Sequence, residues 1–334
     1  MKAVMMTAVG GPEVLEVRKV PLPTIDRGNQ LLVRLKAAGI NPVDTKLRSR
    51  GTYYPDRLPT ILGCDGAGVV EEVGPQVRRF RPGDEVFFCF GGIGNQPGTY
   101  AEYTVIEEDC VAQKPTHWSF VEAAAAPLVC ITAWESLHDR GRIAPNSTVL
   151  IHAGAGGVGH VAIQLAVAAG ARVATTVGNS EKVAFVQKLG AERPLLYREQ
   201  DFVTETLAWT GGEGVDLAFD TVGGRTFAAT FPAVRVYGDL VTILQPSAEV
   251  DWGVARSRNL RISLELMLTP MHLNLAAALR HQGKILEHCA TLAQTNKLHI
   301  HVAETLPLAQ AALAHQRIQL GSTSGKIVLM LESD

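Results

Sequence analysis

The sequence predicts an α/β protein in which a doubly wound parallel sheet is joined to a second, β-rich domain. Three observations carry this prediction. Strand-like and helix-like segments alternate after Thr148, a glycine-rich turn joins the first of these strands to a helix, and the residues before Ser119 form short runs separated by Gly and Pro. Alternating strands and helices are typical of parallel sheets, and short runs between turns are typical of antiparallel ones.

The N-terminal part contains the short runs. Residues 1–7 have the pattern of a first strand, and residues 81–84 (RPGD) form a turn signal between two later strands. The character changes at Ser119, which precedes Glu122 by three residues ahead of an alanine run, as in the capping box that begins a helix. Further strands are expected at 31–35, 68–73, 85–88 and 100–105.

Strands and helices alternate after Thr148, as a doubly wound sheet requires. Helices are expected at 159–169 and at 181–189, the second capped by Ser180, and a glycine follows each of them. The strands are expected at 149–152, 172–177, 194–197, 216–219, 240–244 and 261–266.

The residues after Pro270 depart from this alternation, and we expect them to return to the first domain. The predicted domains are therefore 1–126 with 267–334, and 127–266. The elements expected in the tail are a helix at 273–293, a strand at 298–303, a helix at 308–319 and a strand at 326–331.

Composition is that of an ordinary soluble enzyme, with 46% hydrophobic and 19% charged residues. Lys and Arg number 31 against 33 Asp and Glu, and a net charge of −2 gives no field to attract nucleic acid or an anionic membrane. The five scattered cysteines fit reduced thiols, and no signal peptide or membrane span is visible, so we expect a cytoplasmic protein. His299 and His301 alternate on an expected strand but lack a third metal ligand.

The most informative motif is Gly154-x-Gly156-x-x-Gly159, which follows an apolar run and opens an alanine-rich helix. Gly154 permits a tight turn, Gly156 lets a pyrophosphate approach the backbone, and Gly159 lets the helix pack against the strand. Free N–H groups and the positive end of the helix attract phosphate. The motif predicts a Rossmann dinucleotide site, with Gly157 and Val158 at the cofactor.

The end of the next strand predicts which nicotinamide cofactor binds. An NAD site usually carries Asp or Glu about 20 residues beyond the glycine turn. Here Gly178, Asn179 and Ser180 are small or neutral and leave room for a 2′-phosphate, to which Lys182 can supply positive charge. We therefore expect NADP(H).

Five further segments stand in order along the chain: 38–45 (AGINPVDT), 63–70 (GCDGAGVV), 81–86 (RPGDEV), 98–103 (GTYAEY) and 324–329 (SGKIVL). Together with the glycine turn they resemble the medium-chain dehydrogenase/reductase superfamily, in its zinc-independent quinone oxidoreductase branch. The resemblance covers nearly the whole chain. It implies a GroES-like catalytic domain built from both chain ends around a Rossmann cofactor domain.

The resemblance also implies individual cofactor residues. Tyr197 matches the tyrosine that caps the 2′-phosphate in quinone reductases, and Lys326 is expected at the cofactor. Asp220 stands at the end of one expected parallel strand and Leu244 at the end of another, and ligands bind at that edge of such sheets. We expect all four residues to contribute to the cofactor site.

The main departure from the alcohol dehydrogenases of this superfamily lies in the residues at the zinc-ligand positions. Their catalytic-zinc positions read here as Asn41, the pair Cys64-Asp65, and about Leu128. Asn and Leu are poor zinc ligands, and residues 88–95 lack the four cysteines of the structural-zinc loop. We therefore expect no metal.

Without zinc, hydrogen-bond donors must polarise the acceptor carbonyl. Asn41, at a zinc-ligand position, is expected to face the nicotinamide, and Thr132 matches a superfamily residue near it. Tyr53 and Tyr54 are expected to touch the substrate ring. The alternatives are a turn residue for Asn41, a helix residue bonded to its own backbone for Thr132, and loop packing for the tyrosines.

The expected activity is NADPH-dependent reduction of a quinone or another α,β-unsaturated carbonyl compound, with the choice between hydride delivery to a quinone and to an enone carbon left open. Alternatives are a zinc-type alcohol dehydrogenase and a cofactor-bound structural or RNA-binding homologue, although no basic patch favours RNA. A homodimer is expected through the edge strand of the cofactor domain. Its alternation places on one face Ile262, Leu264, Leu266 and Leu268.

Overall fold

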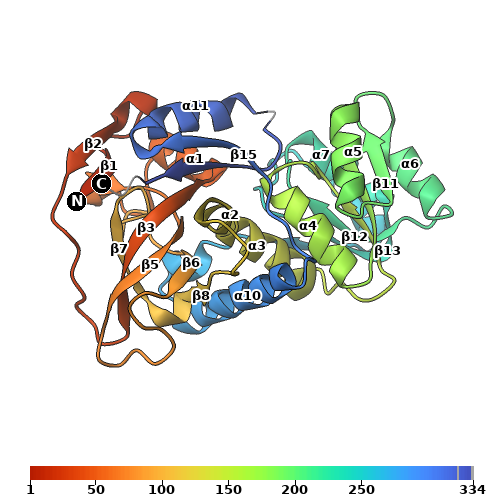
Figure 1. The fold of residues 1–334 in the computed structure, drawn as a ribbon. Helices are drawn as coiled ribbons and strands as arrows, with labels where there is room; N and C mark the ends of the chain where they lie inside the picture. Colours follow the sequence, from red (N-terminus) through yellow and green to blue (C-terminus); the bar gives the residue numbers. More distant parts are fainter. Residues whose placement is uncertain (322, 332–334) are drawn as a thin grey trace. The chain divides into compact units, whose positions relative to one another are not determined.

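The computed structural model describes residues 1–321 and 323–331 and divides into two compact units. Unit 1 comprises Met1–Leu128 and Leu268–Asp334, and unit 2 comprises Val129–Met267. The ranges expected from the sequence differ from these by one or two residues. The last strand pairs with an N-terminal one in unit 1, so the tail returns to the first domain (Figure 1).

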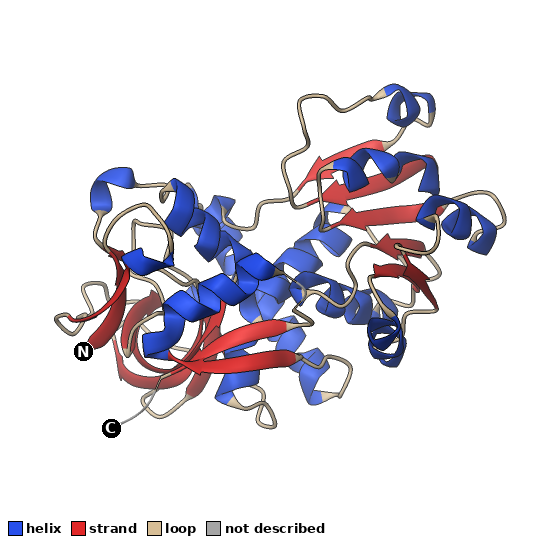
Figure 2. Cartoon of the chain, turned by 90° about the horizontal axis from the view of Figure 1, so that it is seen from above, coloured by secondary structure: helices blue, strands red, loops and turns tan. Residues whose placement is uncertain are grey.

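Unit 2 is built on a parallel sheet of six strands in the order β11-β10-β9-β12-β13-β14. This is the 3-2-1-4-5-6 order of the Rossmann fold and confirms the predicted fold class. Figures 1 and 2 show helices along this sheet, with α4 and α5 in the foreground of Figure 1. The strands are β9 (Thr148–Ile151), β10 (Arg172–Val177), β11 (Arg193–Leu196), β12 (Val215–Asp220), β13 (Val234–Thr242) and β14 (Arg261–Leu264). The helical segments are the end of α3 (Pro127–Trp134), a π-helical turn (Glu135–Arg140), α4 (Gly157–Ala168), α5 (Ser180–Lys188), α6 (Phe202–Trp209), α7 (Arg225–Ala229) and α8 (Gly253–Ser257).

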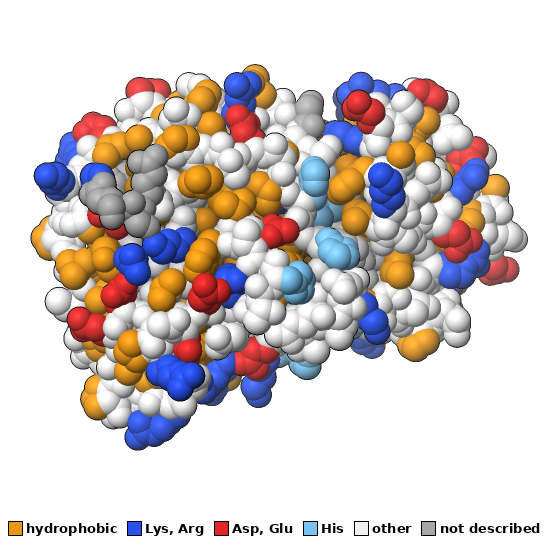
Figure 3. Space-filling model, viewed as in Figure 1, with side chains coloured by type: hydrophobic (Ala, Val, Ile, Leu, Met, Phe, Trp, Pro, Cys, Tyr) orange, Lys and Arg blue, Asp and Glu red, His pale blue; other side chains and the backbone are white. Residues whose placement is uncertain are grey.

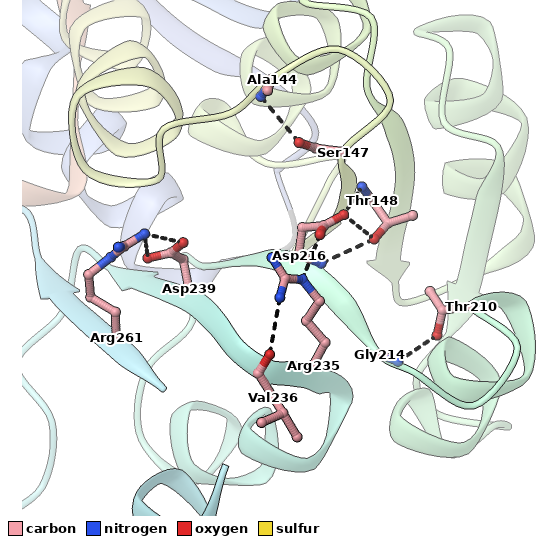
Figure 4. A network of polar contacts seen from close by, with 10 residues as sticks. All are labelled: Ala144, Ser147, Thr148, Thr210, Gly214, Asp216, Arg235, Val236, Asp239 and Arg261. Atoms are coloured by element: carbon pink, nitrogen blue, oxygen red, sulfur yellow. Dashed lines mark hydrogen bonds and ion pairs between the residues drawn. The ribbon is translucent and has the colours of Figure 1, made fainter. Parts of the chain in front are cut away.

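Polar side chains hold together the amino ends of the central strands (Figure 4). The Asp216 carboxylate accepts hydrogen bonds from the backbone N–H and the hydroxyl of Thr148, at 2.7 and 2.9 Å, and from Arg235 Nε at 2.6 Å. These contacts join the starts of β9, β12 and β13 at the edge opposite their carboxyl ends. The carboxyl ends, where ligands bind in such sheets, are therefore free of this network.

Unit 1 contains a sheet of seven strands and a smaller sheet of three. In the larger sheet the order is β15-β16-β3-β5-β6-β8, with β7 paired to β3. A Cβ on Gly39 would lie 2.3 Å from the Ala124 carbonyl oxygen, so helix α2 rests directly on the backbone of β3. The strands are β1 (Lys2–Met6), β2 (Leu15–Lys19), β3 (Gln30–Ile40), β4 (Thr60–Ile61), β5 (Asp65–Val73), β6 (Glu85–Cys89), β7 (Tyr103–Glu107), β8 (Val111–Gln113), β15 (Val302–Pro307) and β16 (Lys326–Met330). The helices are α1 (Pro42–Arg50), α2 (Phe120–Ala125), α9 (Thr269–His272), α10 (Ala276–Gln294) and α11 (Ala311–Leu320).

The structure confirms one predicted helix start and corrects a second helix start and one strand start. Ser119 and Glu122 form the predicted capping box of α2. Helix α5 is capped by Asn179, whose side chain accepts from the Lys182 N–H, and not by Ser180, which is its first residue. Strand β15 begins only at Val302, so residues 299 and 301 precede it and do not share a strand face.

Charges of both signs are interspersed on the face shown in Figure 3. No helix of residues 1–321 and 323–331 is both long and apolar enough to cross a bilayer.

Candidate functional site

The glycine turn between β9 and α4, residues 153–159, is called the phosphate turn below. A Cβ on Gly154 would lie 2.0 Å from the Thr175 hydroxyl oxygen, and one on Gly159 would lie 2.3 Å from the Ala153 carbonyl oxygen. The left-handed residue of the turn is Ala153, with φ of 51°, and not Gly154, to which the sequence interpretation assigned the tight turn. Gly154 is required instead because no side chain fits beside Thr175.

The amino end of α4 is open for an anion. Gly156 is its N-cap and has no side chain to satisfy the first N–H groups of the helix, which begins with Gly157 and Val158. Such N–H groups have no partner within a helix, and together with the helix dipole they favour phosphate. The phosphate turn thus fits the pyrophosphate of a dinucleotide.

A second group of predicted residues gathers at the carboxyl ends of β10 and β11. A Cβ on Gly178 would lie only 3.3 Å from the hydroxyl oxygen of Tyr197, so the two residues face each other. Tyr197 is half exposed, and the Arg198 guanidinium lies 5.9 Å from its ring centre. Asn179 and Lys182 belong to the first turn of α5 beside them. The structure therefore brings the residues predicted for the 2′-phosphate together.

The two predicted residues at β12 and β13 also lie near each other. Asp220 is fully buried, and its carboxylate accepts from the N–H groups of Val222 and Gly223, both at 2.9 Å, and from the Thr242 hydroxyl at 2.9 Å. The Leu244 side chain packs against Gly223, where an added Cβ would lie 2.8 Å from it. Asp220 thus shapes the loop at the sheet edge with its own hydrogen bonds. Thr132 is buried in α3.

In unit 1, Asn41 is the centre of a buried polar network that we call the Asn41 network: Asn41, Asp65, Lys326 and the backbone of Leu128. Asn41 Nδ2 donates to Asp65 at 2.9 Å, and the Leu128 N–H donates to the other Asp65 oxygen at 2.8 Å. The Lys326 ammonium donates to Asn41 Oδ1 and to the Ile40 carbonyl, and it lies 3.5 Å from Asp65. Both polar atoms of the Asn41 amide thus have partners inside unit 1.

This network joins Asn41, Asp65 and Leu128, the three positions that the family resemblance set against catalytic-zinc ligands. Asp65, next to Cys64, is hydrogen-bonded by residues 41 and 128, and Lys326 supplies the positive charge. A hydrogen bond with Cys89 favours the Cys64 thiolate, but burial and two neighbouring carboxylates raise the pKa of the Cys64 thiol overall. Among residues 1–321 and 323–331 no three His, Cys, Asp or Glu side chains are grouped to hold a metal.

A second polar chain begins one helical turn further on, at Asp44. Its Oδ2 accepts from the Asn41 N–H at 2.8 Å and from the Tyr100 hydroxyl at 3.0 Å, and that hydroxyl lies 3.2 Å from His315 Nε2. Asp44 Oδ1 is buried and has no hydrogen-bond partner among residues 1–321 and 323–331. Burial raises the pKa of Asp44 to about 7, although these hydrogen bonds oppose the shift. Burial also lowers the pKa of His315, to about 3.

The two predicted tyrosines both pack against His272. The Tyr53 ring is tilted over the imidazole, with centroids 4.5 Å apart, and the Tyr54 ring meets it edge-on at 5.9 Å. The Tyr54 hydroxyl donates to the His272 carbonyl at 2.8 Å and is thereby occupied. Burial raises the pKa of Tyr53, so its hydroxyl stays protonated at neutral pH.

Residues at both sites escaped the sequence analysis. Asp65 was recognised only as a lost zinc ligand, and neither Tyr100 nor His315 gave a local signal, because their partners lie 56 and 215 residues apart in the chain. The Thr176 hydroxyl accepts from the Ala153 N–H at the phosphate turn, but in the sequence it looks like any strand threonine. Only contacts between distant segments identify these residues.

Comparison with known proteins finds two matching family models. Residues 27–116 match the alcohol dehydrogenase GroES-like domain, and residues 189–329 match the zinc-binding dehydrogenase family. The chain is 32% identical over 327 residues to quinone oxidoreductase 1 of Escherichia coli, covering 96% of this chain and 97% of that protein.

Solved structures agree. An alcohol dehydrogenase superfamily protein from Novosphingobium aromaticivorans is 35% identical, with a TM-score of 0.92 over 99% of this chain and 100% of that one. The E. coli quinone oxidoreductase complexed with NADPH is 30% identical, with a TM-score of 0.85 over 99% and 100%.

The raised pKa of Asp44 predicts how the free energy of unfolding changes with pH. Its pKa is raised in the folded chain, so its stabilising contribution is complete below the unfolded value near 4 and is lost as the pH rises through about 7. In Asp44→Asn this loss disappears, and the free energy of unfolding should fall less between pH 4.5 and 8 than in the unchanged chain. Urea denaturation at a series of pH values measures the slopes. Asp26→Asn, at an exposed carboxylate, should retain the original slope. An Asp44→Asn slope equal to that of the unchanged chain would contradict the assignment.

Proposed function

We propose that this chain, which belongs to the medium-chain dehydrogenase/reductase superfamily and to its quinone oxidoreductase-like branch, reduces quinones or other α,β-unsaturated carbonyl compounds without zinc. Its cofactor is NADP(H). The observation that carries the proposal is the Asn41 network, because its hydrogen bonds and buried ammonium engage the side chains at the zinc-ligand positions.

NADPH, when bound, supplies the hydride. We assign its pyrophosphate to the phosphate turn, whose N–H groups at the start of α4 are uncapped. We assign the 2′-phosphate to Gly178, Asn179, Ser180, Lys182 and Tyr197, where the absence of a carboxylate at the strand end leaves an anion unopposed. Asp220, Leu244 and Thr132 would line the same edge of the sheet.

For the acceptor, Tyr53 is the better candidate of the two tyrosines. The Tyr54 hydroxyl already donates within unit 1, whereas the Tyr53 hydroxyl stands on a half-buried ring that is tilted over the His272 imidazole. A donor of this kind stabilises the negative charge that develops on a carbonyl oxygen during reduction. We assign Asn41 and Lys326 to the support of this site, since their polar atoms bind one another and Asp65.

A homodimer through unit 2 is also part of the proposal. Strand β14 is the outermost strand of its sheet. Leu264 at its end is 61% exposed, and Leu266, two residues beyond the strand, is 51% exposed. An apolar edge strand is a liability that pairing with a second copy removes. Ile262 packs inward against the core, and Leu268 is buried, so the predicted apolar face is shorter than the sequence suggested.

The activity is tested by a turnover screen. With NADPH the purified protein should reduce quinones or enals, and a zinc chelator should leave the rate unchanged, because the Asn41 network needs no metal. Alcohol oxidation serves as the comparison reaction for a zinc-type alcohol dehydrogenase. Stoichiometric zinc, with activity lost on chelation and restored by zinc, would identify that enzyme instead. Binding of NADPH without turnover of any acceptor would favour a structural or RNA-binding homologue.

Lys182→Ala tests the 2′-phosphate assignment. A charge-assisted hydrogen bond to phosphate contributes about 1.5–3 kcal/mol, so the Kd for NADPH should rise roughly ten- to a hundredfold while the Kd for NADH stays nearly constant. Fluorescence titration measures both constants. Lys188→Ala, on an exposed residue in the last turn of the same helix, is the matched control. An equal loss for the two cofactors would reject a phosphate-specific role.

Tyr53→Phe tests the acceptor site. If the hydroxyl donates to the developing oxyanion, kcat/KM for a quinone should fall about ten- to a hundredfold. Tyr54→Phe removes only the bond to the His272 carbonyl and should cost about 0.5–1.5 kcal/mol of stability with little loss of rate. Steady-state kinetics and thermal unfolding of both variants separate these outcomes. Equal kinetics in the two variants would mean that Tyr53 only packs against the loop.

A further inference from the structure

His152 lies directly before the phosphate turn and is fully buried. Its Nε2 is 2.9 Å from the Thr230 hydroxyl oxygen and its Nδ1 is 3.2 Å from the Thr176 hydroxyl oxygen. The ring packs edge-on against Phe202, with centroids 4.9 Å apart. The proposed reaction uses none of these contacts, yet they fix a buried histidine beside the phosphate turn.

The hydrogen atoms in this group can be assigned from its acceptors. The Thr230 hydroxyl donates its only hydrogen to the Thr226 carbonyl at 2.7 Å, so His152 Nε2 must carry a hydrogen and donate to Thr230. Burial lowers the pKa of His152 to about 4 despite the nearby Asp220, so the ring is neutral near pH 7. A neutral ring with hydrogen on Nε2 has a free lone pair on Nδ1. The Thr176 hydroxyl therefore donates to Nδ1.

The same Thr176 oxygen accepts from the Ala153 N–H at 3.0 Å. Ala153 is the left-handed residue of the phosphate turn, a conformation that a residue with a Cβ holds only when its surroundings impose it. Its carbonyl oxygen accepts from the Gly156 N–H at 2.9 Å. The same oxygen occupies the space that a Cβ on Gly159 would need. The orientation of Ala153 therefore sets how α4 begins.

We propose that His152 is a positioning residue of the cofactor site: it orients the Thr176 hydroxyl, which holds Ala153 and so the N–H groups that face the pyrophosphate. The ring acts through Thr176 and Ala153 and does not itself touch the cofactor. This inference rests on the proposed placement of the pyrophosphate at the phosphate turn.

Four variants separate the two ends of the ring. His152→Phe fills the ring volume and removes both polar atoms, and Thr176→Val removes the hydroxyl at nearly constant shape. His152→Asn places an amide oxygen near the Nδ1 position, where Thr176 can donate to it, whereas His152→Gln reaches toward the Nε2 position and Thr230. Phe202→Leu changes packing on the same ring without altering a hydrogen bond and is the control.

We expect the Kd for NADPH to rise about tenfold in His152→Phe and in Thr176→Val, with the kinetic effect on the KM for NADPH and not on kcat. The double variant should be little worse than either single one, because both break the same chain of bonds. His152→Asn should restore most of the affinity and His152→Gln little of it, and Phe202→Leu should bind as the unchanged chain does.

Titration of NADPH fluorescence gives Kd, and thermal unfolding of the same samples shows that each variant is folded. Affinities within twofold of the unchanged chain in folded His152→Phe and Thr176→Val would overturn the proposal, as would a better rescue by Gln than by Asn. If those two variants do not fold, the comparison of Asn with Gln decides. A failure of the proposed function looks different, because the unchanged chain would then bind NADPH no better than NADH.

Discussion

The ion pair of Lys326 and Asp65, held by Asn41, is the interaction on which unit 1 depends. Lys326 is 4% exposed and Asp65 is 0% exposed. Removing each charge from water costs several kcal/mol, and the attraction between the charges offsets that cost only when their remaining hydrogen bonds are satisfied. Here the Asn41 amide, the Leu128 N–H and the Ile40 carbonyl satisfy them. The contacts connect the ends of β3, β5 and β16 and the approach to α3, so segments from both ends of the chain meet at one charged centre.

This centre lies at the positions that the family resemblance matches to zinc ligands. A divalent ion would draw together ligands from the segments that carry residues 41, 64, 65 and 128. In this chain a lysine from the C-terminal strand supplies the positive charge, and hydrogen bonds supply the directionality. In unit 2 the corresponding constraint is the left-handed Ala153, which contacts from β10 and the glycines of α4 hold in place. In each unit, contacts from segments distant in the sequence thus hold one structural feature in place: the Lys326–Asp65 pair in unit 1 and the left-handed Ala153 in unit 2.

The sequence predicted the fold class and the phosphate turn because both depend on local patterns. Alternating segments, the glycine spacing and the capping box at Ser119 are encoded within a few residues each. The hydrogen bonds of the Asn41 network were not predicted, because Asp65 and Lys326 lie 24 and 285 residues from Asn41 in the sequence. The left-handed position fell on Ala153 and not on a glycine, since long-range contacts with Thr176 impose it. Strand β15 was placed too early because residues 298–301 alternate in polarity yet precede the pairing with β16.

A double-mutant cycle on Lys326 and Asp65 tests the central claim most directly, with the free energy of unfolding measured by urea denaturation. Lys326→Met alone leaves a buried carboxylate without its cation and should cost about 3–5 kcal/mol. Adding Asp65→Asn removes that charge, so the double variant should be more stable than Lys326→Met and the two effects should couple by at least about 1 kcal/mol. Additive losses, with the double variant the least stable of all, would show that the two residues act independently and would contradict the account.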